Sequence, residues 1–310
     1  MILVTSPTSF IGRAVVLRLA VEQRSIRCLL QPSRHEQRLA TGVTFSIASA
    51  SFTDVPDLRA AMQGVTTVIH LARGEERLEE QRLQDQPMQT ANLLRAAQEA
   101  GVTRFIYLSR LGATPASAYP LFRVKGESEV EIQQSGLDYT IFRSAVVYGA
   151  DDAFTTRVVM LAKMCPLLLP IPDTGMARFQ PLWVEDLAKC IVATIDRNDL
   201  IGRTVALGGP EHYTLEQMTR RVLEAASARR YLLHVGMPLM QTGSDLLQPL
   251  LVRSPTPKWW LDLAAVGSAT ELGAVPKHFG FEPCQFARCL SHLRRQRPWR
   301  RDFIRHVLGY

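Results

Sequence analysis

The stretch "MILVTSPTSFIGRAVVLRLA", residues 1–20, combines a short apolar run, a turn and an amphipathic segment. Residues 1–5 have the length and the apolar character of a buried strand. In the segment that follows, Ile11, Val15 and Leu19 recur at the spacing of one helix face. The sequence therefore predicts a strand that turns directly into a helix.

The same alternation continues through the first half of the chain. Five further apolar runs predict strands, at residues 25–30, 43–47, 66–72, 104–109 and 137–142. Helical patterns fill several of the gaps, over residues 54–64, 75–101 and 122–136. Strands that alternate with helices at this spacing are joined by right-handed crossovers and form a parallel sheet covered on both faces. We therefore predict an α/β fold of the Rossmann type, with a doubly wound parallel sheet as its core.

The pattern becomes less regular in the second half of the chain. A proline-rich segment at residues 165–175, a capped helix at 214–227 and an apolar segment at 231–266 follow one another without a low-complexity linker. We predict a dinucleotide-binding type of core over residues 1–150. A smaller C-terminal α/β part over residues 151–310, interleaved with that core, would contact a substrate or a partner.

Composition excludes several classes of protein. Hydrophobic residues make up 46% and charged residues 21% of the 310 residues, which is typical of a globular domain and not of a disordered one. No secretory signal and no apolar stretch of about 20 residues is visible. The five cysteines form no C-x-x-C pair and the seven histidines are scattered, so we expect reduced thiols and no metal site. The expected location is the cytoplasm, with contact to a membrane surface left open.

The positive charge of the chain is concentrated at one end. Residues 291–310 hold six arginines and one aspartate, a net charge of +5 out of +7 for the whole chain. Trp299, Phe303 and Tyr310 are interleaved with these arginines. This basic tail suits an anionic membrane surface or an acidic protein. The alternative is an amphipathic terminal helix docked on its own domain.

The apolar segment before the tail suggests further contacts. Trp259 and Trp260 beside several leucines would line a substrate pocket, form a partner interface or touch a membrane surface. We therefore predict that residues 231–310 contact a protein complex or an anionic membrane surface. Nucleic acid is not expected, because no recognised nucleic-acid module accompanies the charge.

Five phrases in order carry a family resemblance. They are "LVTSPTSFIGRAVV" (3–16), "GVTTVIHLA" (64–72), "NLLRAAQEAGVTRFIYLS" (92–109), "VKGESEVEIQQSGLDYTIFRSAVVYG" (124–149) and "RFQPLWVEDLAKCI" (178–191). Together they resemble the short-chain dehydrogenase/reductase superfamily in its atypical or extended branch. Within it the chain is most similar to the NmrA-like group and to the nucleotide-binding accessory subunit of respiratory complex I. The resemblance implies a dinucleotide at the carboxyl edge of the sheet, with its pyrophosphate at the start of the first helix.

The first turn departs from the family pattern. Ser6, Ser9 and Gly12 stand at the positions of the three glycines in the family's G-x-x-G-x-x-G turn, and Phe10 and Ile11 complete the predicted cofactor contacts there. A Cβ at the first two positions narrows the space for the phosphates and disfavours a positive φ. The serine hydroxyls would compensate in part by donating to a phosphate. The resemblance therefore implies a dinucleotide site in which binding is weakened or absent.

Other cofactor contacts also differ from the family. Ala48 and Ser49 stand where the family has a Gly-Asp pair that holds adenine. Ser33 and Arg34 follow the second strand, where they match a 2′-phosphate, so NADP(H) is favoured over NAD(H). The alternative for Arg34 is a solvated loop charge. The remaining predicted cofactor contacts are Ala72, Arg73, Ser109 and Lys125.

The catalytic pattern of the family is incomplete. Members that transfer hydride use Tyr-x-x-x-Lys on a helix, in which the tyrosine exchanges the proton. Here the lysine is Lys125 and the tyrosine position is Leu121. Tyr119 lies six positions before the lysine, on another face of a helix. The family's serine falls near Arg110, which leaves Ser109 one position early.

Lys125 is the one candidate catalytic residue, because some NmrA-like relatives work with a lysine alone. The alternative is a surface lysine paired with the glutamates between Glu127 and Glu131. Glu185 and Asp186 are predicted to begin a helix and not to act in catalysis.

We therefore predict an accessory, assembly or regulatory protein with no enzymatic activity. One alternative is an NADPH-dependent reductase of a small carbonyl, enone or quinone. A further alternative is redox sensing through occupancy by NADP(H).

Overall fold

The computed structural model divides into two compact units, each made of two segments of the chain. It describes residues 1–32, 39–71, 83–165, 167–247, 258–294, 299 and 301. Unit 1 comprises Met1–Ser144 and Val184–Leu207, and unit 2 comprises Ala145–Trp183 and Gly208–Tyr310. The first crossing between the units lies close to the predicted boundary after residue 150.

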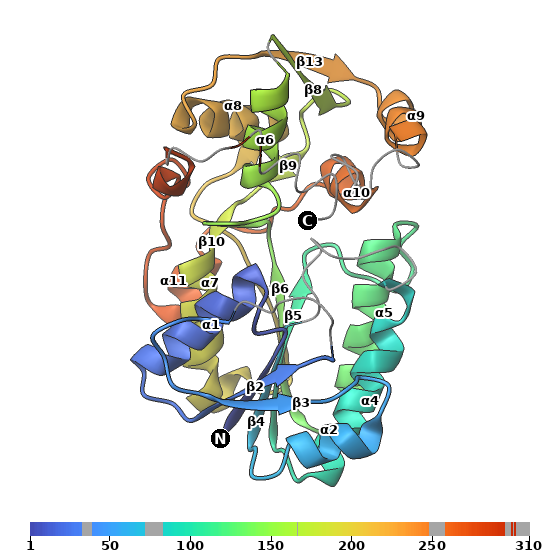
Figure 1. Ribbon diagram of the computed structural model, residues 1–310, viewed down its shortest axis with the longest axis vertical. Coiled ribbons are helices and arrows are strands. Elements are labelled where there is room, and N and C mark those ends of the chain that lie inside the picture. The colour runs from blue at the N-terminus through green and yellow to red at the C-terminus, as the bar shows by residue number, and fades with distance from the viewer. Residues whose placement is uncertain are drawn as a thin grey trace. The chain divides into compact units, whose positions relative to one another are not determined.

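Unit 1 is built on a seven-stranded parallel sheet (Figure 1). Its strands are β1 (Ile2–Thr5), β2 (Ile26–Leu30), β3 (Ser46–Ser49), β4 (Thr67–Leu71), β5 (Arg104–Arg110), β6 (Asp138–Ser144) and β11 (Arg203–Leu207). They are arranged in the order β11-β6-β5-β4-β1-β2-β3, and every pair of neighbours is parallel. The predicted doubly wound, Rossmann-type sheet is confirmed.

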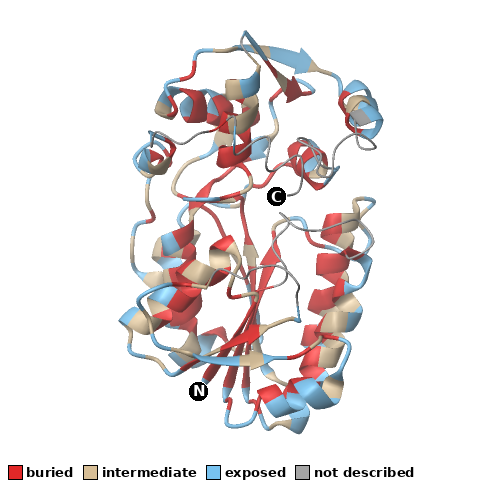
Figure 2. Ribbon diagram, viewed as in Figure 1, coloured by how far each residue is buried: buried red, intermediate tan, exposed pale blue. Residues whose placement is uncertain are grey.

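Helices cover both faces of this sheet. They are α1 (Phe10–Val21), α2 (Val55–Ala61), α4 (Gln86–Glu99), α5 (Pro120–Gln134) and α7 (Val184–Ala193). Helices α4 and α5 lie along one face, and α1 and α7 along the other (Figure 1). Figure 2 shows the central strands and the inward sides of these helices as buried, and the edge strand β3 as largely exposed. Phe105 and Ile141 of the sheet and Leu93 and Ile132 of the helices are among the residues of this core.

Two strands differ from the sequence prediction. Strand β3 begins at Ser46 and not at residue 43, and β11 was not predicted. Both lie at the edges of the sheet. In β11 only Val205 and Leu207 are buried, and no residue of β3 is fully buried. Their apolar patterns are therefore weak, because an edge strand has less surface to bury.

Glu185 and Asp186 lie in the first turn of α7, as predicted. Carboxylates at this position stabilise a helix through its dipole. Helix α7 packs against α1. Glu185 and Asp186 therefore belong to the helical layer that covers one face of the sheet.

Unit 2 is a smaller set of helices and two-stranded sheets. Its helices are α6 (Thr155–Met164), α8 (Leu215–Ala225), α9 (Met237–Leu247), α10 (Lys258–Val266) and α11 (Ala274–Phe279). Its strands are β7 (Val147–Tyr148), β8 (Leu168–Pro172), β9 (Arg178–Phe179), β10 (Leu182–Trp183), β12 (Tyr213–Thr214) and β13 (Tyr231–Val235). The predicted capped helix at residues 214–227 is confirmed as α8, where Thr214 and Gln217 form a capping box.

The two tryptophans of α10 belong to the core of unit 2. Trp259 and Trp260 are both buried. The ring of Trp260 lies 5.9 Å from that of Phe154, and the guanidinium of Arg157 lies 5.3 Å from the ring of Trp259. Their burial contradicts the expectation that these indoles touch a partner or a membrane, whereas lining a substrate pocket stays a prediction. Within the described ranges no helix has the length and apolar character needed to cross a bilayer.

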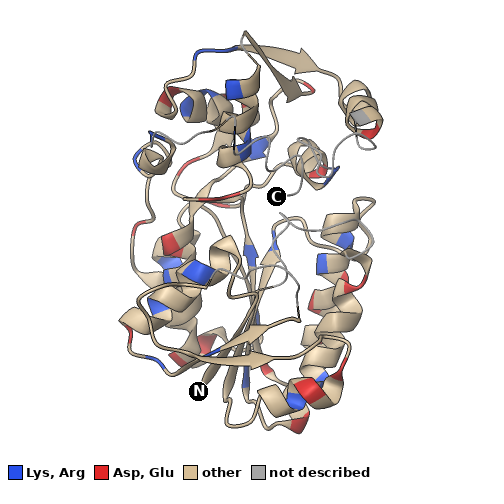
Figure 3. Ribbon diagram, viewed as in Figure 1, with Lys and Arg blue, Asp and Glu red and all other residues tan. Residues whose placement is uncertain are grey.

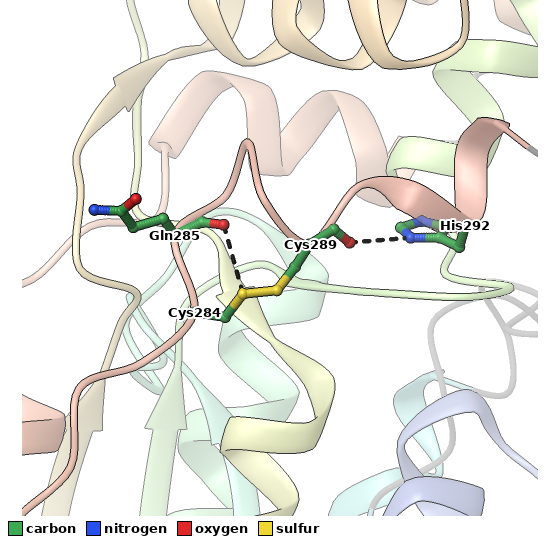
Figure 4. The surroundings of a disulfide bond; sticks show 4 residues. All are labelled: Cys284, Gln285, Cys289 and His292. Atoms are coloured by element: carbon green, nitrogen blue, oxygen red, sulfur yellow. Dashed lines mark hydrogen bonds between the residues drawn. A yellow bond between two sulfur atoms is a disulfide. The ribbon is translucent and has the colours of Figure 1, made fainter.

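A disulfide joins Cys284 and Cys289 in unit 2 (Figure 4). The expectation that all five thiols are reduced is therefore wrong for this pair. The backbone N–H groups of Arg288 and Cys289 both donate to the Gln285 carbonyl, so a tight turn brings the two cysteines together. A search for C-x-x-C spacing misses this pair, because four residues separate its members. Since disulfides are typical of oxidising compartments, the bond also removes one basis for expecting a cytoplasmic location.

A glycine within α5 permits a close contact, which yields a prediction. A Cβ on Gly126 would lie closer than 3.0 Å to backbone atoms of Thr114 and Pro115, whereas one on Gly243 in α9 would meet no atom within 4 Å. We expect Gly126→Ala to lower the free energy of unfolding by about 1–3 kcal/mol through overpacking. We expect Gly243→Ala to raise it by up to about 1 kcal/mol through helix propensity. Urea unfolding of both variants checks this pair, and equal effects of one sign would contradict it.

Candidate functional site

The turn after β1 lies at the point where the strand order of unit 1 reverses. Strand β1 pairs with β4 on one side and with β2 on the other. The crossovers leave β1 in opposite directions, so a crevice forms beyond the carboxyl ends of these strands. The position of the turn is therefore that of a nucleotide site in open α/β sheets.

The backbone of this turn has the form that the family's glycines supply. Ser6 adopts a φ of 49°, in the left-handed region. A Cβ on Gly12 would lie closer than 3.0 Å to the Ser6 carbonyl oxygen and to Pro7 Cα, so only glycine fits where α1 meets the turn. Phe10 is buried and Ile11 is half-buried. The predicted obstacle at Ser6 is therefore not a barrier to the turn itself, since serine adopts the required φ.

Ser9 uses one of the donors at the start of α1. It is the N-cap of the helix, and its Oγ accepts a hydrogen bond of 3.0 Å from the backbone N–H of Gly12. The open N–H groups at a helix N-terminus are what bind a phosphate. The turn therefore fits a pyrophosphate in its backbone shape, while one of its donors already has a partner within the chain.

Arg13, in the first turn of α1, is a residue beside this loop that the sequence did not single out. Its Nη1 donates to the carbonyl oxygen of Thr8 at 2.9 Å, which holds the guanidinium beside the turn. Its position directly after Gly12, the glycine that contacts the turn, is the sequence signal by which Arg13 could have been identified. A guanidinium here would attract the phosphates of a nucleotide.

The other cofactor predictions are only partly within the described residues. Ser33, Arg34, Ala72 and Arg73 lie outside them. Ala48 and Ser49 form the end of β3. The predicted preference for NADP(H) thus stays a prediction.

Lys125 is buried in the layer between α5 and the sheet. It is 5% exposed, and its Nζ lies 5.4 Å from the centre of the Tyr107 ring of β5. The alternative of a surface lysine is therefore wrong. Leu121, one helical turn earlier, is 1% exposed. Tyr119 is the N-cap of α5, so it lies before the helix and not on one of its faces.

Ser109 is held by an ion pair whose carboxylate, Glu129, is buried while Arg143 is partly exposed. Its Oγ donates to Oε1 of Glu129 at 2.5 Å, and the same carboxylate accepts two hydrogen bonds from Nε of Arg143 and one from its Nη2. Leu121, Lys125 and Glu129 lie at intervals of four residues, so they share one face of α5. That spacing is the signal that would have found Glu129.

His70, in strand β4, is a further buried polar residue of the sheet. Its Nδ1 lies 3.0 Å from the Thr5 hydroxyl, and its ring stacks on Tyr107 at 5.4 Å. Burial, and secondarily the charge of Lys125, lower the pKa of His70 to about 3. The imidazole is therefore neutral in the folded protein.

Among the described residues, these buried groups are directed toward one another. Burial raises the pKa of the Tyr107 phenol, and its side chain is fully buried. Ser109 donates its hydroxyl proton to Glu129, and Leu121 carries no proton to exchange. The arrangement therefore stabilises the contact of α5 with the sheet, and Leu121 stands where the resemblance predicts a tyrosine.

A family model described as NAD(P)H-binding matches residues 8–167 of the chain. This match covers more than half of the chain. It includes the end of the first turn from Thr8, and β4, β5, α5 and β6.

Relatives with known names are subunits or assembly factors of large complexes. The chain is 28% identical to the NADH dehydrogenase [ubiquinone] 1 alpha subcomplex subunit 9, mitochondrial, of Arabidopsis thaliana, over 68% of this chain and 54% of that protein. It is 26% identical to the photosystem II assembly factor Ycf39 of Trieres chinensis, over 70% of this chain and 66% of that protein. The chain thus spans little more than half the length of the first of these relatives.

Solved structures confirm the fold. A nucleoside-diphosphate-sugar epimerase of Staphylococcus aureus is similar at a TM-score of 0.75 and 17% identity, over 95% of this chain and 99% of that one. An NADPH-dependent quinone oxidoreductase of Escherichia coli, complexed with NADPH, is similar at a TM-score of 0.74 and 19% identity, over 94% of this chain and 99% of that one. With the relatives above, they confirm the resemblance that the five sequence phrases indicated.

The buried imidazole of His70 generates a prediction about pH. In the unfolded chain a histidine binds a proton below about pH 6.5, whereas folded His70 does so only near pH 3. Its contribution to stability is therefore complete above pH 6.5 and is lost as the pH falls, by up to about 1.4 kcal/mol per pH unit. Urea unfolding between pH 7.5 and 5 should show this slope in the parent and a smaller one in His70→Gln.

The matched control for this experiment is His212→Gln. His212 is exposed, and its Nε2 lies 2.8 Å from the Thr270 carbonyl oxygen. This variant should keep the slope of the parent. An unchanged slope in His70→Gln would show that the imidazole is not held neutral.

Proposed function

Because this chain belongs to the NAD(P)H-binding family, we propose that it is an accessory, assembly or regulatory component of a protein complex and transfers no hydride itself. The observation that carries the proposal is the buried Leu121, one helical turn before Lys125. An aliphatic side chain there leaves no acid or base to exchange a proton with a substrate oxygen. The bond from Ser109 to Glu129 supports the same conclusion, since that hydroxyl already has a buried acceptor.

The names of the relatives support a role within a complex. One is a subunit of a mitochondrial NADH dehydrogenase and another is an assembly factor of photosystem II. We propose that the present chain contacts its partner complex, or an anionic membrane surface, through residues 231–310. Its proposed location is the cytoplasm, at the periphery of a membrane.

We also propose that the turn after β1 binds NADP(H) in preference to NAD(H), with low affinity. A bound nicotinamide would supply a hydride to the site. The backbone N–H groups at the start of α1 would hold the pyrophosphate, Ser33 and Arg34 would meet the 2′-phosphate, and Lys125 would contact the nicotinamide ribose. We expect the affinity to be low because the backbone N–H of Gly12 already donates to Oγ of Ser9.

A second candidate is an NADPH-dependent reductase that uses Lys125 on a small carbonyl, enone or quinone. The observation that favours it is that the ammonium of Lys125 is buried beside the ring of Tyr107 in β5. Lysine side chains are rarely buried, and a buried lysine does not contribute to solubility. Turnover of a substrate separates this candidate from the accessory role.

The first prediction concerns the turn. Ser9→Ala removes the hydroxyl that accepts from Gly12 N–H but keeps the Cβ, whereas Ser9→Gly removes both. We expect Ser6→Gly with Ser9→Gly to tighten NADPH binding by about tenfold, or about 1.4 kcal/mol. Ser9→Ala should give part of this gain if the occupied donor is the obstacle. Titration of nicotinamide fluorescence measures both, and unchanged affinity in all variants would contradict the proposed role of the serines.

The second prediction concerns catalysis. With NADPH present at saturation, the parent should oxidise no cofactor above background when given a panel of quinones and enones. Turnover that Lys125→Ala abolishes and Lys189→Ala preserves would instead establish the reductase. Absorbance of the reduced nicotinamide follows the reaction, while the fluorescence titration reports separately whether the cofactor binds.

A further inference from the structure

One face of the two-stranded sheet in unit 2 is apolar and exposed. Strands β8 and β13 are parallel, with Tyr231 opposite Leu168 and Leu233 opposite Pro170. Side chains alternate along a strand, so these four residues share one face of the sheet. Tyr231 is 76%, Leu168 49% and Leu233 47% exposed. We call this surface the β8–β13 face.

The opposite face of the same sheet is packed along β8 and remains partly exposed along β13. Leu169 and Ile171 of β8 are buried, and His234 of β13 lies 3.2 Å from a carboxylate oxygen of Glu216 in α8. Figure 1 shows α6 and α8 on the inner side of these strands, and Figure 2 shows β13 exposed along most of its length. The fold therefore uses one side of the sheet for its core and leaves an apolar side open. Contiguous exposed apolar surface of this kind is typical of an interaction site.

Basic side chains gather at the end of the sheet where both strands begin. Helices α6 and α8 end there: Nζ of Lys163 donates to the Ala226 carbonyl at 3.3 Å, and Nε of Arg230 donates to the Ala162 carbonyl at 2.7 Å. Arg229 is exposed, and its side chain makes no hydrogen bond or ion pair with the residues that the structure describes. Figure 3 shows basic residues where the chain leaves α8 and runs to β13.

An open pocket of about 810 Å³ lies at the same end of the unit. Arg220, Arg229 and Arg230 line it, together with Glu224, Leu223 and two small residues. Arg221 pairs with Glu224 at 3.1 Å and Arg220 with Glu216 at 2.6 Å, so Arg229 and Arg230 supply the remaining positive charge. The pocket is therefore positive on balance. Guanidinium groups in such an arrangement suit the oxygens of a phosphate.

An aromatic and aliphatic face bordered by arginines matches the chemistry of a membrane surface. Leucine and tyrosine side chains enter the boundary between headgroups and acyl chains, and arginines remain among anionic headgroups. Leu167, which is 67% exposed, extends the apolar surface toward the basic end. We propose that the β8–β13 face binds the surface of a membrane rich in anionic phospholipid, with a lipid phosphate in the pocket at the end of α8.

This inference deepens the proposed function by naming the surface that contacts a membrane. It differs from the sequence prediction in its residues, because Leu167, Leu168 and Arg229 precede residue 231 and the basic tail is not part of it. It also does not depend on the nucleotide site in unit 1. Loss of vesicle binding and loss of NADPH binding are therefore separate results.

The test is cosedimentation of the full chain with vesicles. We expect binding to vesicles made of equal parts phosphatidylglycerol and phosphatidylcholine, weaker binding at high salt, and little binding to phosphatidylcholine alone. Arg229→Gln should weaken the partition coefficient about fivefold, the equivalent of about 1 kcal/mol for one charge near the surface. Tyr231→Ser with Leu233→Ser should weaken it at every salt concentration, and Tyr231→Phe should preserve it.

Two control variants match these changes in exposure and chemistry. Leu272→Ser alters a leucine of similar exposure elsewhere in unit 2, and Arg203→Gln removes an exposed arginine from β11. Both should bind vesicles like the parent. Circular dichroism and thermal unfolding establish that each variant is folded, so a loss of binding is assigned to the surface.

Three results would overturn the proposal. The first is a parent that does not bind anionic vesicles. The second is binding that survives all changes in the β8–β13 face and is lost when Arg300, Arg301 and Arg305 are changed to glutamine, which would assign it to the basic tail. The third is a self-associated parent that Tyr231→Ser with Leu233→Ser converts to a monomer without any effect on vesicle binding, which would make the face an interface between copies of the chain.

Discussion

The contact between Gly12 and the Ser6 carbonyl governs how unit 1 is built. No side chain fits between α1 and the turn after β1, so the helix begins directly at the edge of the sheet. Because β1 lies between β4 and β2, this turn stands where the two sets of crossovers diverge. The left-handed φ of Ser6 makes the reversal possible without a glycine. Fold and candidate site therefore depend on the same few backbone atoms.

Around this turn, the polar groups of the sheet edge are paired with one another. Ser9 accepts from Gly12, Ser109 donates to Glu129, and His70 lies within hydrogen-bond distance of Thr5. In an enzyme of this fold, comparable groups would be held ready for cofactor and substrate. Their internal pairing costs little stability, because buried polar groups that find partners avoid a desolvation penalty. These hydroxyls and the imidazole therefore already have partners within unit 1.

The sequence predicted the sheet because strands and helices alternate strongly where both faces are covered. It did not predict β11, whose buried residues are too few to form a pattern, nor the pairing of Cys284 with Cys289, which depends on a local turn. The absence of an acid at Leu121 could be read directly from the position of Lys125. The burial of Lys125 and its neighbour Glu129 could not, because helical spacing shows which residues share a face but not which face is inward. The sequence thus predicted the features that depend on the residue type at one position. It did not predict the features that depend on contacts between elements.

The cap that Ser9 places on α1 has a consequence for the life of the protein in a cell. Many nucleotide-binding proteins gain stability from their ligand, so their abundance rises and falls with its supply. Here a hydroxyl of the chain satisfies an amide that a phosphate would otherwise bind. The start of α1 is consequently stabilised without a bound phosphate, so we expect the folded state to depend little on the supply of dinucleotide.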